Sequence, residues 1–175
     1  METDLRYPVG KFHRVTTLTA TERGELIETI AQAPARMRDA VKGLTESQVD
    51  TPYRPEGWTV RQVVHHVPDS HMNAVVRMKL ALTENEPTIK PYEESEWAKL
   101  ADAKAPIEPS LALLDALHAR WVVLLSSLGE KEWTRRFLHP AMGPMSLEQT
   151  LALYAWHSRH HVAHVTSLRE REGWK

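Results

Sequence analysis

Seven of the ten histidines in this 175-residue chain lie in two short segments. Residues 157–164 (HSRHHVAH) hold four histidines, and residues 63–71 (VVHHVPDSH) hold three more. Histidines at positions i and i+4 of a helix place two imidazole rings on one face, where both can reach one metal ion. The sequence therefore predicts a metal centre assembled from two helices.

The later segment offers two such pairs, His157 with His161 and His160 with His164. At about 100° per residue, the two pairs lie about 60° apart around the helix axis, so spacing does not choose between them.

In the earlier segment, His66 lies on the same side as Val63 and is expected to face the core. His65 follows Arg61 by four residues and is expected to face solvent. A single helical histidine is usually a packing or surface residue, but two clusters in a chain without cysteine favour a metal site. Three neutral imidazoles with an open position are typical of a catalytic rather than a structural metal centre.

Four helices are expected to carry these groups, over about residues 19–44, 59–82, 110–128 and 147–171. Capping boxes begin at Thr19, Thr59 and Ser146, and leucines at helical spacing mark the third helix. Pro34 is expected to kink or split the first helix. A short helix is expected within 93–100, whereas residues 130–145 read as irregular, with strand signals nearly absent from the chain.

These elements predict an all-α protein, an antiparallel four-helix bundle with a long connection between its second and third helices, about residues 84–109. One domain is expected over residues 1–175, with 1–18 as an N-terminal arm.

Composition narrows the class of protein. The net charge of −1 gives no electrostatic footprint for nucleic acid or an anionic membrane. Without cysteine, any metal must be held by nitrogen and oxygen ligands. We find neither a secretory leader nor an apolar run of membrane-spanning length, so a cytoplasmic location is expected.

The chain resembles the YfiT-like branch of the DinB superfamily. The resemblance covers almost the whole sequence, and it is most specific in the two histidine segments taken together. It is carried by residues 57–73 and 154–164, with further agreement at 51–54, 80–84, 87–92 and 173–174.

The resemblance implies a four-helix bundle, commonly a homodimer, that binds a divalent metal, zinc or in some cases nickel, on three histidines. The family's ligands match His66, which opens a His-x-x-Asp pattern, together with His160 and His164. Pro68 departs from the family pattern. It removes a helical hydrogen bond next to the expected ligand and could re-aim His65 in place of His66.

Other residues could serve the site. Asp69 could orient an imidazole, or could be a solvated carboxylate. His139 could shuttle protons from a loop, although a loop histidine without a catalytic role is the commoner case. Tyr53 and Arg54 could contact an anionic group of the substrate, with a surface salt bridge as the alternative for Arg54. Tryptophans 58, 121, 133 and 156 are expected to be packing residues.

Three functions follow as hypotheses. The family resemblance implies a metal-dependent hydrolase, or alternatively a transferase that acts on a low-molecular-weight thiol such as bacillithiol or mycothiol. In both cases the partner is a small molecule. The third hypothesis is a non-catalytic bundle in which the metal is purely structural and holds the helices together. It requires a fourth protein ligand such as His71 or His139.

Overall fold

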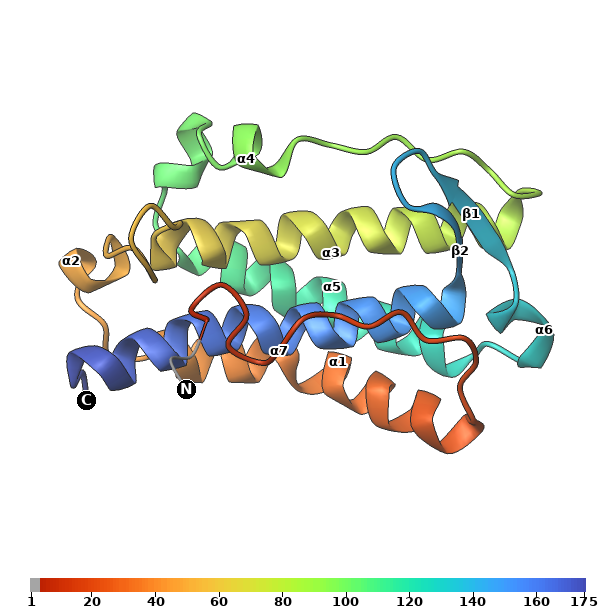
Figure 1. Ribbon diagram of the computed structural model, residues 1–175, viewed down its shortest axis with the longest axis horizontal. Helices are drawn as coiled ribbons and strands as arrows, with labels where there is room; N and C mark the ends of the chain where they lie inside the picture. The colour runs from red at the N-terminus through yellow and green to blue at the C-terminus, as the bar shows by residue number, and fades with distance from the viewer. Residues whose placement is uncertain (1–3) are drawn as a thin grey trace.

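The computed structural model describes residues 4–175, and four long helices form a bundle (Figure 1). They are α1 (Ala20–Val41), α3 (Val60–Thr83), α5 (Glu108–Ser126) and α7 (Leu147–Glu172). The predicted four-helix bundle is confirmed, and each helix begins and ends within three residues of its expected position.

Local sequence explains where the helices begin. Thr19, Thr59 and Ser146 each accept a hydrogen bond from the third residue of the helix that follows, whose side chain bonds back to the cap. An additional capping box at Thr45 starts the short helix α2 (Glu46–Val49), which the sequence analysis did not separate from its connection. Gly173, with φ of 65°, ends α7.

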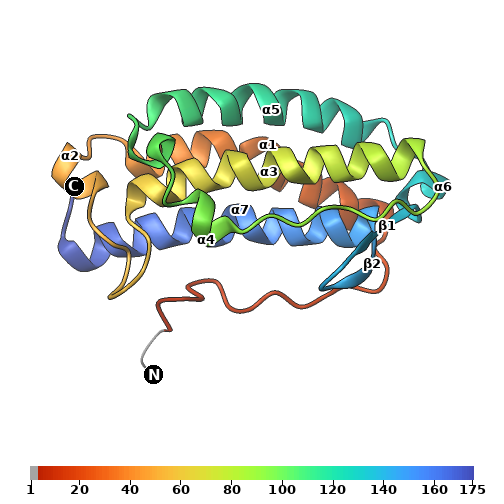
Figure 2. The same cartoon turned by 90° about the horizontal axis from the view of Figure 1, so that it is seen from above.

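Each long helix contacts two others: α1 and α3 both pack against α5 and α7. Helix α1 therefore lies diagonally opposite α3, and α5 lies diagonally opposite α7 (Figures 1 and 2). The connection after α3 runs back along that helix through α4 (Glu94–Trp97) and the 3-10 turn η1 (Ala101–Lys104), so α5 runs parallel to α3. The histidine-bearing helices α3 and α7 are adjacent and antiparallel.

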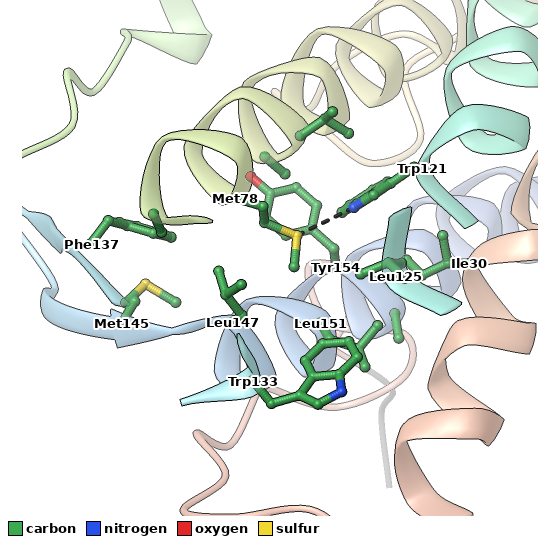
Figure 3. Close-up of a cluster of buried hydrophobic side chains, with 14 of the residues drawn as sticks. Ile30, Met78, Trp121, Leu125, Trp133, Phe137, Met145, Leu147, Leu151 and Tyr154 are labelled. Atoms are coloured by element: carbon green, nitrogen blue, oxygen red, sulfur yellow. Dashed lines mark hydrogen bonds between the residues drawn. The ribbon is translucent and has the colours of Figure 1, made fainter. Parts of the chain in front are cut away.

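The core consists of two apolar clusters. One, shown in Figure 3, surrounds Trp121, whose indole N–H points at the sulfur of Met78. The other lies toward the opposite end of the bundle and includes Met37, Leu114 and Leu168. Along α3 and α5, the residues before His71 and His118 mostly belong to one cluster and the residues after them to the other. Both histidines are fully buried. A layer of histidines thus separates the two apolar regions.

Several local expectations were wrong. Residues 130–145 are ordered as α6 (Glu130–Trp133) followed by a hairpin of β1 (Arg136–His139) and β2 (Gly143–Ser146), with Phe137 paired to Met145. Four-residue strands are too short to show sustained alternation in sequence. Arg61 and His65 are buried rather than solvent-facing, because the connection before α5 covers them.

Pro34 and Pro68 lie inside helices that continue through them, so Pro34 does not split α1. Among residues 4–175, no helix is both long and apolar enough to cross a lipid bilayer.

Candidate metal centre

Three imidazole rings meet between α3 and α7. His66 comes from α3, and His157 and His161 lie one turn apart on α7. The Nε2 atom of His157 is 3.2 Å from Nε2 of His66 and 3.1 Å from Nε2 of His161. We call these three residues the histidine trio.

The spacing of the trio suits a tetrahedral ion. Zn–N bonds of about 2.0–2.1 Å at tetrahedral angles hold two ligand nitrogens about 3.4 Å apart. The observed separations of 3.1 and 3.2 Å are close to that value. Three nitrogen donors leave the fourth position of a tetrahedral ion without a ligand from the trio.

A buried relay of hydrogen bonds fixes the proton of His157. The Nδ1 atom of His118 is 2.6 Å from the Ile30 carbonyl, which can only accept, so His118 carries its proton on Nδ1. Its Nε2 must then accept from Nδ1 of His71, 2.7 Å away. In turn, Nε2 of His71 accepts from Nδ1 of His157 at 3.0 Å. Because each neutral imidazole has one proton, Nε2 of His157 presents a lone pair to the trio.

The origin of this relay is visible in the sequence of α1. In a regular helix the Ile30 carbonyl would accept from the N–H of residue 34, but Pro34 has none. The proline therefore leaves a buried carbonyl without a helical donor, and His118 on α5 supplies the missing hydrogen bond.

A second relay fixes the proton of His161. Nε2 of His164 is 3.2 Å from the carbonyl of Arg6 and donates to it. Its Nδ1 therefore accepts from Nδ1 of His161 at 3.3 Å. The Nε2 atom of His161 is then also free of a proton and faces the trio. Both α7 members of the trio are thus held as metal-binding tautomers by groups behind them.

A second group of three histidines, His160, His161 and His164, also brings one ring nitrogen from each within 4.8 Å. The two groups share His161, and a neutral imidazole has a single lone pair, so His161 serves one group at a time. The relay from Arg6 directs that lone pair toward the trio.

The ligand set expected from the family resemblance, His66, His160 and His164, is not one of the groups brought together among residues 4–175. His66 joins the other α7 pair instead. The physical reason is the rotation of α7. His160 stacks on Trp156, with ring centroids 4.4 Å apart, and His164 stacks on Tyr53 at 3.9 Å, which turns both rings toward the N-terminal arm and the α2–α3 connection.

His65 does not take the place of His66. Its Nε2 donates to the Ala105 carbonyl at 3.0 Å, and its Nδ1 accepts from the Ser110 hydroxyl at 2.6 Å. Both of its nitrogens are therefore engaged on the side of α3 away from the trio. His71 likewise has both nitrogens in the relay, which leaves it no lone pair for a metal.

The electrostatics favour neutral imidazoles. Burial, followed by repulsion from His160, lowers the pKa of His66 to about 4. Burial likewise lowers the pKa of His157 and of His161 well below the usual range, with neighbouring histidines adding to the effect. At neutral pH the trio carries no charge, as metal ligation requires.

A cavity of about 650 Å³ opens onto the trio and also borders Tyr53, Arg54 and His139. His139 stands at the end of β1, where its Nδ1 accepts from the Ala141 N–H at 3.2 Å. Tyr53 forms a wall through its contact with His164, and Arg54 donates to the Tyr53 hydroxyl at 3.3 Å. These residues expected to serve the site therefore do line it.

Asp69 does not line this cavity. It borders a smaller void next to His65 and His66, and among residues 4–175 its carboxylate makes no hydrogen bond to a histidine. Burial, with repulsion from Asp102, raises its pKa. The ring nitrogens of the trio histidines on α7 contact His71 and His164 instead.

Of the tryptophans expected to pack, Trp121 and Trp133 are buried in the core. Trp58 and Trp156 line the cavity and contact His66 and His160 respectively, with ring centroids 4.7 and 4.4 Å apart.

Sequence reasoning missed His118, which showed no spacing relation to the other histidines. It does, however, occupy a core position of the third helix, between Leu114 and Trp121. A polar residue within an apolar stripe, together with a proline inside a facing helix, was the available signal.

Comparison with known proteins agrees with the fold. Residues 29–165 match the model of the DinB superfamily. A relative from Bacillus mycoides (strain KBAB4), named "Putative metal-dependent hydrolase", is 54% identical over 171 residues, covering 98% of this chain and 99% of the relative.

The solved structure of YfiT from Bacillus subtilis, described as "a probable metal-dependent hydrolase with an unusual four-helix bundle topology", superposes with a TM-score of 0.96 at 46% identity. It covers 98% of this chain and 99% of YfiT. TT2238, "a four-helix bundle protein", shares the fold alone, with a TM-score of 0.57 at 18% identity over 80% of this chain and 94% of TT2238. Because the family model spans most of the sequence and the two Bacillus proteins match it nearly end to end, the chain belongs to the DinB superfamily.

Proposed function

We propose that this protein is a metal-dependent hydrolase of small molecules, with one divalent ion held by His66, His157 and His161. The names of its relatives support a metal-dependent hydrolase. The choice of ligands is supported by one observation: two relays, each ending on a main-chain carbonyl, leave the Nε2 atoms of His157 and His161 free of protons where they meet His66.

The donor set fits an ion with an open position, because three neutral nitrogens converge at the wall of a cavity large enough for a metabolite. A bound divalent ion supplies Lewis-acid chemistry, lowering the pKa of water and polarising an electrophile. Neutral nitrogen ligands and a near-tetrahedral spacing favour zinc, with nickel as the alternative.

Two tyrosine hydroxyls in the rest of the cavity supply hydrogen bonds. Burial raises the pKa of Tyr92 to about 12 and also raises that of Tyr154, so both hydroxyls keep their protons at neutral pH. Both residues line the cavity with Ser70 and can donate to oxygen atoms of a substrate. His139, whose Nδ1 accepts from the main chain, carries its proton on Nε2 and remains the candidate for proton transfer.

The first test is the metal content of protein purified without a nickel column. We expect about one divalent ion per native chain. His157→Ala and His161→Ala should lose the ion, since each removes a ligand. His160→Ala is the matched control on the same helix and should retain it. Loss of the ion from His160→Ala, with retention in His157→Ala, would assign the metal to the other group.

The second test is a panel of nitrophenyl esters, phosphates and anilides with the metal-loaded and chelated protein. Turnover that requires the ion and disappears in His157→Ala supports hydrolysis. The same samples should be tested with bacillithiol or mycothiol and monochlorobimane. Conjugation that requires the metal, without hydrolysis of any substrate, would replace the hydrolase by the thiol S-transferase.

A purely structural metal predicts four protein ligands. His71 is unsuited to be the fourth, because both of its nitrogens belong to the relay. X-ray absorption of the zinc-loaded protein distinguishes a catalytic from a structural metal. We expect three histidine nitrogens and one exchangeable light atom around the ion, whereas four histidines would indicate a structural site.

A homodimer is the remaining expectation from the family. Light scattering of the native chain at micromolar concentration tests it, with twice the 20.0 kDa chain mass as the expected result.

A further inference from the structure

Arg77 shares the cavity with the histidine trio but takes no part in it. It lies on α3, eleven residues after His66. Eleven residues rotate the helix by about three full turns, so both side chains project from nearly the same face. Side chains on a helix lean toward its N-terminus, which directs the Arg77 side chain back toward the trio.

The guanidinium of Arg77 differs in its ion pairing from those of other arginines in the described part of the chain. Among residues 4–175, no carboxylate lies within salt-bridge distance of it, whereas Arg23, Arg38 and Arg61 are each paired with two carboxylates. Its Nε atom is buried and, within this described part of the chain, donates to no acceptor. An unpaired buried donor typically costs about 1–3 kcal/mol, so an arginine kept in this state suggests a partner that arrives with a ligand.

Arg77 lies beside two tyrosines, and the exposed Glu94 is a carboxylate whose charge also reaches them. Its Cζ atom is 5.9 Å from the centre of the Tyr92 ring. It is near enough to Tyr154 to lower the pKa of that hydroxyl, against the larger raising effect of burial. Because both tyrosines stay protonated, neither neutralises the guanidinium.

The charge of the loaded site adds to that of Arg77. Three neutral imidazoles leave the full charge of a divalent ion uncompensated. The acidic residues that line the cavity, Glu56 and Glu94, are both solvent-exposed. The interior of the cavity is therefore positive and suits an anion.

We propose that Arg77 binds an oxyanion, a carboxylate or phosphate group, of the substrate whose reacting bond lies at the trio. A planar guanidinium can hold either group through two parallel hydrogen bonds. The assignment rests on the proposed hydrolase function for its catalytic meaning. The binding of an anion by Arg77 can nevertheless be measured without any reaction.

The test is calorimetric titration of the metal-free and zinc-loaded protein with benzoate, phenyl phosphate and, as the neutral counterpart, benzyl alcohol. Native protein should bind at least one anion ten times more tightly than benzyl alcohol. Arg77→Gln should lose that preference while its zinc content stays native, and Arg77→Lys should keep part of it. Arg120→Gln is the matched control and should bind the anions as the native protein does, because Arg120 is exposed on α5 and does not line the cavity.

A preference for benzoate would identify carboxylate substrates, and a preference for phenyl phosphate would identify phosphorylated ones. The proposal is overturned if native protein binds neither anion more tightly than benzyl alcohol, or if Arg77→Gln, at a native melting temperature, binds them as the native protein does. Should Arg77→Gln fail to fold, Arg77→Lys decides, since a retained charge with altered geometry must weaken anion binding. Absence of bound zinc would count against the hydrolase but would leave the metal-free titration decisive for Arg77.

Discussion

Replacing His118 by leucine should weaken metal binding although His118 touches no metal. In the native relay, the Ile30 carbonyl requires a proton on His118 Nδ1, and this choice passes through His71 to His157. In His118→Leu, the Nδ1 proton of His71 would face a methyl group. The relay can avoid this by reversing, so that His71 donates to Nδ1 of His157 and the proton of His157 moves to Nε2, where it blocks the ion.

The size of the effect follows from the number of donors involved. In the native protein, the opposite proton arrangement would turn a lone pair of His118 toward the Ile30 carbonyl. In the variant, the native arrangement would leave the buried Nδ1–H of His71 without an acceptor. Each such mismatch is worth about 1–3 kcal/mol, which corresponds to about 5- to 150-fold in a binding constant. We therefore expect the zinc affinity of His118→Leu to fall about 10- to 100-fold, the range usual for groups behind a metal ligand.

Competition against a chromophoric chelator at pH 7.5 measures the affinity. Trp121→Phe is the control: Trp121 contacts both relay histidines, with ring centroids 5.7 Å from His71 and 5.6 Å from His118, but gives them no proton. Its zinc affinity should change by less than about threefold. Equal affinities in His118→Leu and native protein would refute the relay, and equal losses in both variants would show that packing, not proton placement, is responsible.

His164→Phe keeps a ring against Tyr53 and should retain one ion per chain. In the same chelator competition it should bind that ion about 10- to 100-fold more weakly, because His161 loses the acceptor that fixes its proton. Complete loss of the ion would make His164 a ligand. The metal-free protein should lose stability as the pH falls from about 6.5 toward 4. The pKa of His66 is about 4 in the folded chain and near 6.5 in the unfolded chain, so the unfolded chain takes up the proton first, and His66 alone costs about 1.4 kcal/mol per pH unit. Urea midpoints that do not change between pH 7 and 5 would contradict this. Trp121→Ala should lower the urea-derived free energy of unfolding by about 3–5 kcal/mol, because the indole is fully buried.

The sequence was sufficient for the helices because their signals are local. Capping boxes at Thr19, Thr59 and Ser146 and the apolar spacing of the third helix each act within a few residues. The hairpin after α6 was missed, because its strands are held by pairing with each other and by the extended segment at residues 87–89. Such pairing leaves little trace in four residues of sequence.

The pair of histidines on α7 could not be chosen from spacing, because the choice depends on how far the helix is rotated against α3. The buried residues of α7 contain the answer in part. His161 lies seven residues from both Tyr154 and Leu168, which are buried, so it falls on the line that faces the core. The direction of the protons depends on carbonyls from α1 and from the N-terminal arm, and no local pattern near the histidines reports them.

The relay also predicts a loss of stability at His118. Burial lowers the pKa of this histidine, so below about pH 6.5 the unfolded chain binds a proton that the folded chain resists, which favours unfolding. Leucine removes this cost, but it leaves the buried Ile30 carbonyl without a donor, which costs about 1–3 kcal/mol. The metal-free His118→Leu variant should therefore unfold at a lower urea concentration than the native protein at pH 7.5, and the difference should narrow at pH 6. A histidine present only for packing would lose stability with metal affinity unchanged, whereas the relay predicts that stability and zinc affinity both fall.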